Sequence, residues 1–129
     1  MKKIVSVIVV FVLLVATVVL EQIFIDRTLS SLNEKIDFLD KTIEATETIN
    51  TTEIKNSIDD LDSFWTEKEK VLCISINHND LNRVGEQIKK IKVYIEQNNK
   101  DDCVYEIKVL KFYAESYDHT MELNPQNVL

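Results

Sequence analysis

The stretch LSSLNEKIDFLDKTI, residues 29–43, decides the fold of this chain. Its large apolar residues recur at alternating steps of three and four, which is the spacing of one face of an α-helix. These residues are Leu29, Leu32, Ile36, Leu39 and Ile43. The stripe is narrow enough for packing of the coiled-coil type, and it is buried only if other helices cover it. We therefore expect an all-α protein built as a helical bundle.

Toward the N-terminus, the predicted helix meets a long apolar segment with no breaker between them. Residues 4–20 contain only one serine and one threonine as polar residues, and a helix of that length spans roughly 26 Å. Extended to Ile25, it reaches roughly 33 Å, which is enough to cross a bilayer. We predict a transmembrane anchor over residues 1–25, with membrane contact through residues 4–25, and a helical domain over residues 26–129.

Charges that flank this segment indicate how the chain is oriented. Lys2 and Lys3 precede it, whereas Glu21, Asp26 and a single arginine, Arg27, follow it. Because basic residues stay on the cytoplasmic side, we expect an uncleaved signal anchor in the cell membrane, a cytoplasmic N-terminus and an extracytoplasmic domain. A cleaved signal peptide is the rival interpretation. Its apolar region would be only about 7–15 residues long and would end in an A-x-A-like site, which is not apparent here.

Composition argues against several classes of function. Glycine and proline each occur once, as Gly85 and Pro125, whereas strand-rich folds need such turn residues at short intervals. Since Lys2 and Lys3 lie before the apolar segment, 13 basic and 22 acidic residues follow it, a formal charge of −9. Such a surface repels phosphate backbones, so we expect no nucleic-acid binding.

Three further helices follow from the same periodicity. Asn50 and Glu53 resemble a capping box at the start of the second helix, and Asn79 or Asp80 is expected to cap the third. We extend the second helix through residues 71–76 because the preceding residues continue its pattern. The stripes expected to face inward are Ile54, Ile58, Leu61, Trp65 and Leu72; Leu81, Val84, Ile88, Ile91 and Ile95; and Cys103, Ile107, Leu110, Ala114, Tyr117 and Met121.

Short connections between helices force neighbours to run antiparallel. The expected architecture is therefore a four-helix bundle whose first helix rises from the membrane and continues to about Thr46. A continuous helix through His78 would instead give a bundle of three long helices. Self-association through the seam of residues 29–43 is open if the chain's own helices do not fill that seam.

The fourth predicted helix carries more apolar residues than one groove buries. Besides its stripe, it has Tyr105, Val109, Phe112 and Tyr113 on the adjoining side, and together the apolar arc covers more than half of the helix. Either this helix packs between several neighbours, or the four residues form a partly exposed strip that binds a partner. They are the candidate partner surface.

Two histidines and the single tryptophan are weaker candidates. Trp65, His78 and Asp80 are the residues to suspect for a small-ligand or metal site. However, a tryptophan at helical spacing is more often a core residue. His119 is expected on the polar side of its helix, and the two histidines lack close ligand spacing. We therefore expect no metal and no other cofactor.

The cysteines and acidic pairs do not indicate catalysis. The third helix runs the length of the bundle between Cys73 and Cys103, roughly 25 Å, so we expect two free thiols in the core rather than a disulfide. Adjacent acids such as Asp59 and Asp60 diverge by about 100° on a helix and indicate a solvated face. No phosphate-binding glycine loop or Gly-x-Ser-x-Gly motif occurs, so we expect a protein that is not an enzyme.

Three short motifs accompany the anchor: Trp65-Thr66-Glu67-Lys68, His78-Asn79-Asp80-Leu81 and the C-terminal Asn127-Val128-Leu129. With them the chain resembles a family of small bacterial single-pass membrane proteins classed as a domain of unknown function. The likeness covers residues 60–129 and the anchor. Asn79 departs from the pattern, in which Glu or a similar residue is common. The resemblance implies an anchored helical domain with no assigned activity or cofactor, and the frequent pairing of its genes with that of another small membrane protein favours partner binding.

These observations predict a non-enzymatic, membrane-anchored helical protein that acts as an accessory subunit or scaffold in a bacterial envelope. Its expected partner is a membrane or envelope protein, bound through protein–protein contacts. The alternative is an extracytoplasmic sensor or binding domain for a small ligand or metal.

Overall fold

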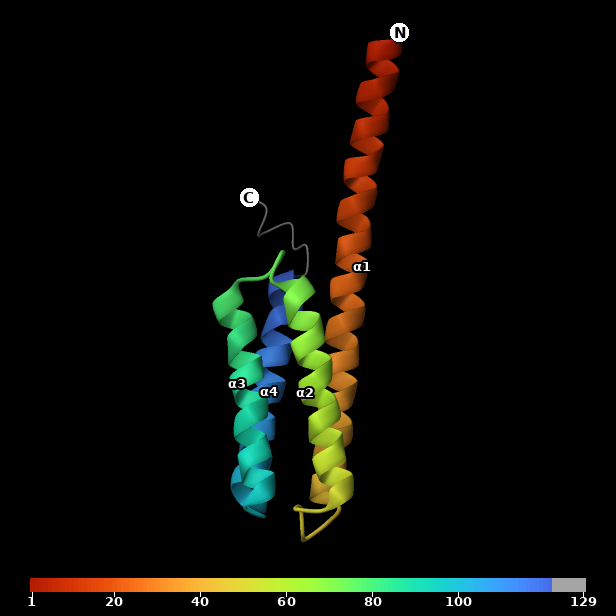
Figure 1. Ribbon diagram of the computed structural model, residues 1–129. Helices are drawn as coiled ribbons and strands as arrows, with labels where there is room; N and C mark the ends of the chain where they lie inside the picture. Colours follow the sequence, from red (N-terminus) through yellow and green to blue (C-terminus); the bar gives the residue numbers. More distant parts are fainter. Residues whose placement is uncertain (122–129) are drawn as a thin grey trace.

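The computed structural model consists of four α-helices joined by short connections (Figure 1). It describes residues 1–121, with side chains through residue 116. The helices are α1 (Lys2–Glu44), α2 (Thr52–Leu72), α3 (His78–Glu96) and α4 (Lys100–Met121). No strand occurs in this part of the chain, so the all-α prediction is confirmed.

The helices alternate in direction and form a ring in chain order (Figure 1). Within the described residues, each helix packs against the next one along the chain, and α1 closes the ring against α4. The α1–α2 and α3–α4 connections lie at one end of the bundle, and the α2–α3 connection lies at the other, from which α1 protrudes (Figure 1). Because α2 and α3 are separate and antiparallel, the alternative of a continuous helix through His78 is wrong.

The predicted stripes form the core. All the stripe residues of α1, α2 and α3 are at most 1% exposed, and Cys103, Ile107, Leu110 and Ala114 of α4 are fully buried. Tyr117 and Met121 lie outside the described side chains. Since each stripe occupies one face of its helix, four faces meet along a common axis and remove a continuous apolar column from water.

The helix α1 runs unbroken from the N-terminus to the far end of the bundle, ending at Glu44, close to the predicted Thr46. Its first buried residue is Ile25, whereas the side chains of residues 4–20 are exposed. Among the helices of the described chain, α1 has the length and apolar composition needed to cross a membrane. The N-terminal part of α1 is therefore a candidate membrane span that continues directly into the bundle.

The boundaries of α2 differ from the prediction. Its cap is Thr51, whose Oγ1 accepts a hydrogen bond from the Ile54 amide at 3.3 Å, and not Asn50. The helix ends at Leu72 rather than extending through residues 71–76. Both residues 50 and 51 have side chains suited to capping, and only the path of the chain into α2 selects between them.

The start of α3 also differs from the prediction. Asn77 caps this helix by accepting a hydrogen bond from the Asn79 amide at 2.9 Å, so the expectation of a cap at Asn79 or Asp80 is wrong. The earlier cap lets Ile76, on the connection, turn back into the core, where it is 8% exposed.

The end of the bundle opposite the protruding helix is held by polar contacts between its two connections. Asn98 has a left-handed backbone, with φ of 53°, which ends α3. Its Oδ1 accepts a hydrogen bond from the Ile49 amide at 2.8 Å. Lys100 Nζ donates to the Thr46 carbonyl oxygen at 2.6 Å, beyond the C-terminal end of α1, where a cation is favourable.

Candidate functional site

The outward face of α4 carries an apolar stripe. Tyr105, Val109 and Phe112 follow one another at steps of four and three, on the side of the helix opposite the core residue Ala114. The aromatic residues Tyr105 and Phe112 are 65% and 66% exposed, and Val109 is half-buried. We call these three residues the α4 stripe. In the described structure it faces solvent, because the two neighbours of α4 lie to either side of it.

Tyr113, the fourth residue of the predicted surface, behaves differently. It is half-buried and packs against the core, and its ring lies 6.3 Å from that of Phe112 at an angle of 56°. The predicted apolar strip therefore divides into an exposed part and a part that packs between helices. The structure thus shows packing between helices on one side of α4 and exposed apolar side chains on the other, and partner binding by the exposed part stays a prediction.

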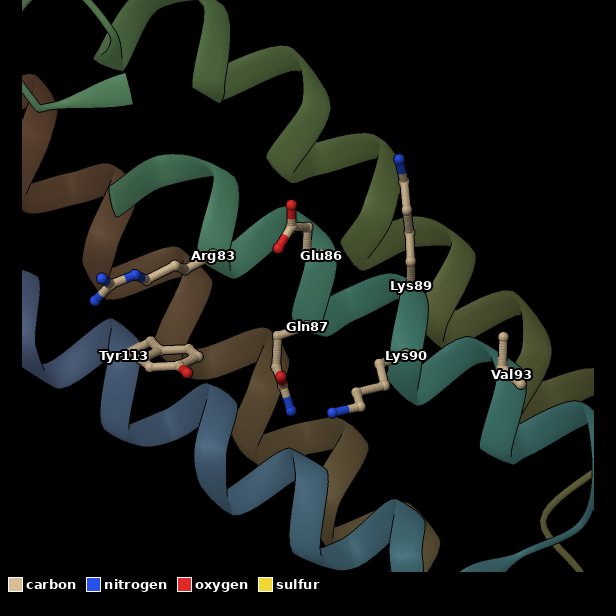
Figure 2. A pocket seen from close by; sticks show the side chains of 7 residues that line it. All are labelled: Arg83, Glu86, Gln87, Lys89, Lys90, Val93 and Tyr113. Atoms are coloured by element: carbon tan, nitrogen blue, oxygen red, sulfur yellow. The ribbon is translucent and has the colours of Figure 1, made fainter. Parts of the chain in front are cut away.

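A shallow groove of about 520 Å³ lies between α3 and α4, next to the stripe (Figure 2). Figure 2 shows Tyr113 of α4 approaching Arg83 and Gln87 of α3, while Glu86 and Lys89 point away from α4. The lining residues are Arg83, Glu86, Gln87, Lys89, Lys90, Val93 and Tyr113.

The polar groups at the base of this groove satisfy one another. The Gln87 amide donates to the Glu106 carbonyl oxygen at 2.9 Å and also to the Glu106 carboxylate. Lys90 Nζ lies 3.5 Å from the other carboxylate oxygen of Glu106. Both Gln87 and Glu106 are buried, and hydrogen-bonded partners are what a buried polar side chain requires. This network joins α3 to α4 and offers a ligand few free polar groups.

The weaker ligand candidates do not converge. Trp65 is 1% exposed, and its Nε1 donates to the Leu81 carbonyl oxygen at 3.3 Å. His78 is exposed at the first position of α3, and Asp80 is half-buried in the first turn. The surface depression beside Trp65 is lined by residues of α2 and α3 that include neither His78 nor Asp80.

Metal-ligating side chains are dispersed in the same way. Within the described residues, no three His, Cys, Asp or Glu side chains gather closely enough to hold a metal ion. The side chain of His119, the second histidine, lies outside the described part.

The two cysteines occupy contrasting environments, and both are free thiols. Cys103 is fully buried, and burial, together with the nearby Asp40 carboxylate, raises the pKa of its thiol to about 11. Cys73 is exposed on the α2–α3 connection, where its Sγ donates to the Lys70 carbonyl oxygen at 3.0 Å. The expectation that Cys73 is a core residue is wrong, because α2 ends one residue before it.

Several buried polar residues were not expected from the sequence. Lys111 of α4 lies 2.5 Å from Asp40 and 3.2 Å from Asp37 of α1, and Asp40 is only 8% exposed. Their positions in the sequence could have indicated this burial. Asp40 and Glu106 each directly adjoin a residue of a core stripe, so they border the helix interfaces.

Fold and surface together define a class: an antiparallel four-helix bundle that grows from a long apolar N-terminal helix and presents an exposed aromatic stripe. Residues 19–128 match the family model described as a domain of unknown function, DUF4363, and the chain belongs to that family. The resemblance to a family of unknown function is thereby confirmed. No curated protein and no solved structure matched the chain.

Proposed function

We propose that this protein is a non-enzymatic, membrane-anchored accessory subunit or scaffold of a bacterial envelope, and that it acts by binding another membrane or envelope protein through the α4 stripe. The observation that carries the proposal is the exposure of Tyr105 and Phe112 on one helical face, joined by Val109. Large aromatic side chains supply much of the energy at protein interfaces, and here both are about two-thirds exposed in the described chain.

The anchor gives the stripe a defined place. Because α1 passes from the candidate membrane span into the core without a break, the bundle is held on a stiff support rather than on a flexible linker. A surface at a fixed height and angle suits a partner that is itself held in the same membrane. Lys2 and Lys3 before the span, against Glu21 and Asp26 after it, favour an extracytoplasmic bundle.

The acidic residues that resemble catalytic pairs are engaged in ion pairs between helices. Lys92 Nζ of α3 lies 2.8 Å from Asp59 and 3.2 Å from Asp62 of α2, and Lys35 Nζ of α1 lies 2.8 Å from Asp60. Side chains that bridge neighbouring helices are not arranged around a common cleft. This distribution supports a binding role over an enzymatic one.

The test uses the intact protein in its native membrane. A photo-crosslinking amino acid is placed at Tyr105 or at Phe112, and in a matched control at Phe38, an aromatic residue on α1 that is 59% exposed. We expect one membrane protein to be crosslinked in stoichiometric yield from positions 105 and 112 and not from position 38. The double substitution Tyr105→Lys and Phe112→Lys should abolish that complex, whereas Phe38→Lys should preserve it.

Two results would contradict the proposal. One is equal crosslinking from all three positions, which would indicate nonspecific contact between exposed aromatic residues and their surroundings. The other is a complex that survives the double lysine substitution. Because both aromatic side chains are about two-thirds exposed, the substituted chain should keep its helical content and its unfolding midpoint, which separates lost binding from lost folding.

A further inference from the structure

We propose that the connection between α2 and α3 is a second membrane contact, which inserts the side chains of Val71 and Ile74 into the lipid interface beside the anchor. This inference rests on the proposed membrane span of α1. It concerns a different part of the surface from the α4 stripe and a different occupant, the lipid bilayer itself.

The first observation is the exposure of large apolar side chains where a water-soluble turn would carry polar ones. Ile74 is 82% exposed and Val71 is 48% exposed. They line the same notch as Leu20 of α1, which is 67% exposed. Exposed apolar residues that gather around one point mark a site of contact with a partner or a membrane.

The second observation is the level of this turn along α1. The α2–α3 connection and α1 line a common, mainly apolar notch of about 350 Å³, with Val71 and Ile74 on one side and Leu20 and Phe24 on the other. Ser75 Oγ donates to the Glu21 carboxylate. A hydrocarbon core about 30 Å thick takes about 20 helical residues. Counted from Ile4, such a core ends near Ile23. The turn therefore lies where the span leaves the hydrocarbon.

Figure 1 shows the same relation in the whole molecule. The α2–α3 connection lies at the end of the bundle from which α1 protrudes, and the other two connections lie at the far end. A bilayer placed around residues 4–23 of α1 thus meets the α2–α3 connection first. Because the apolar patch is continuous with the candidate membrane span, we infer that the lipid bilayer covers it.

The third observation is that the backbone of the turn is already hydrogen-bonded. Four successive amides, of residues 73–76, donate to carbonyl oxygens of Glu69, Val71 and Leu72 at 2.9–3.3 Å. Backbone amides without partners are costly to move away from water, and this cost normally keeps loops out of the interface. The four amides of this turn already have partners, which lowers the cost of moving the turn into the interface and favours insertion of its apolar side chains.

The surroundings of the patch suit the headgroup region. Lys70 is exposed in the last turn of α2, directly before Val71. Lys68, one turn of α2 from Leu72, has its Nζ 5.6 Å from the ring centroid of Phe24 on α1. Ammonium groups beside apolar side chains are typical of segments that lie in a membrane interface, where the cation reaches the lipid phosphates.

The experiment measures depth with a nitroxide label on the full-length protein in nanodiscs of phosphatidylcholine and phosphatidylglycerol. Labels are attached at Ile74→Cys, at Phe11→Cys in the middle of the span, and at Val93→Cys, an exposed apolar position on α3 toward the far end of the bundle. All three carry Cys73→Ala, and the buried Cys103 is left in place. Accessibility to oxygen, which enriches in lipid, is compared with accessibility to a water-soluble nickel complex.

We expect the oxygen-to-nickel ratio at position 74 to lie severalfold above that at position 93 and below that at position 11. A ratio at position 74 equal to that at position 93, with position 11 in lipid, overturns the second contact while the anchor stands. A low ratio at position 11 shows that α1 does not span the bilayer, which overturns both the membrane anchor and the second membrane contact. Protection of position 74 from both reagents shows a protein covering the turn, and the lipid contact is then wrong.

A charge substitution gives an independent check. Because Ile74 is 82% exposed, Ile74→Asp should leave the bundle folded, with unchanged helical content in detergent. In nanodiscs, a label at Val71→Cys should then move toward water, with a drop in its oxygen-to-nickel ratio. An unchanged oxygen-to-nickel ratio at position 71 overturns the proposal, because it would show that the turn was not inserted in the lipid interface before the aspartate was introduced.

Discussion

At the residue scale, the bundle buries a charged carboxylate, that of Asp40, which needs a partner of opposite charge. It is 8% exposed, one of its oxygens lies 2.5 Å from Lys111 Nζ, and its Oδ1 has no hydrogen-bond partner among the described residues. A buried charge is tolerated when it is paired, and the loss of the partner leaves it uncompensated. The stability of the α1–α4 interface therefore depends on Lys111.

Substitution of Lys111 by methionine should destabilise the folded chain by about 1–3 kcal/mol, the cost of leaving a charged acceptor unsatisfied. The change is measured by urea unfolding in detergent, followed through the fluorescence of the buried Trp65. The control is Lys35→Met, which breaks an exposed pair with Asp60 and should cost less than about 1 kcal/mol. Equal effects of the two substitutions would show that Asp40 does not need its cation.

Stability should decrease in alkaline solution, because the pKa of Cys103 rises from 9.0 to about 11 on folding. Between those values the unfolded thiol has lost its proton and the folded thiol has kept it, so rising pH favours unfolding. The expected loss between pH 9 and 11 is about 2 kcal/mol. The hydrogen bond to Asp40 also raises the pKa of Lys111, and its contribution is complete below pH 10.5 and disappears above it.

The measurement is urea unfolding of the full chain at a series of pH values from 8 to 11. In the variant Cys103→Ala the decrease in stability between pH 9 and 10 should become shallow, while the decrease above pH 10.5 that comes from Lys111 remains. A slope that is the same in both proteins would place the alkaline sensitivity elsewhere in the chain.

At the element scale, the helix boundaries depend on single capping residues. Thr51 accepts a hydrogen bond from the Ile54 amide, so Thr51→Ala should destabilise the protein by about 1 kcal/mol. Asn50→Ala, one residue earlier, should change the stability by less than about 0.5 kcal/mol. Thermal unfolding of both variants, monitored by circular dichroism, distinguishes them. A larger effect at Asn50 would mean that the capping box predicted from the sequence is the one in use.

The α4 helix shows why a helical wheel alone does not define a binding surface. Its apolar arc predicts four candidate residues, but Tyr113 packs in the groove toward α3, whereas Tyr105 and Phe112 remain about two-thirds exposed. Periodicity gives the angle of each side chain around the helix. Which angles are covered depends on where α1 and α3 lie, and that is decided by the packing of the whole bundle.

At the scale of the whole molecule, the charges around the span predict an extracytoplasmic bundle. Thr48 lies exposed on the α1–α2 connection, at the end of the bundle away from the protruding helix. In the variant Thr48→Cys with Cys73→Ala, we expect a membrane-impermeant maleimide to label intact cells, since Cys103 is buried. Labelling that requires permeabilised cells would place the bundle in the cytoplasm and reverse the topology.

The sequence by itself determined the all-α class and every core stripe within the described side chains, because a stripe is a repeat along one helix and needs no knowledge of its neighbours. It favoured four helices but left a three-helix bundle open, and the structure decided between them. The sequence also predicted the long α1 helix, since no breaker occurs between Lys2 and Glu44.

Only the tertiary structure decided how these helices use the rest of their surfaces. It selected Thr51 and Asn77 as caps from among adjacent candidates, paired Asp40 with Lys111, and brought the α2–α3 connection beside the candidate span. Each of these features joins residues far apart in the chain or chooses between equivalent neighbours. The physical reason is that burial, pairing and exposure of side chains beside the stripes depend on which helices flank them, and a repeat along one helix does not contain that information.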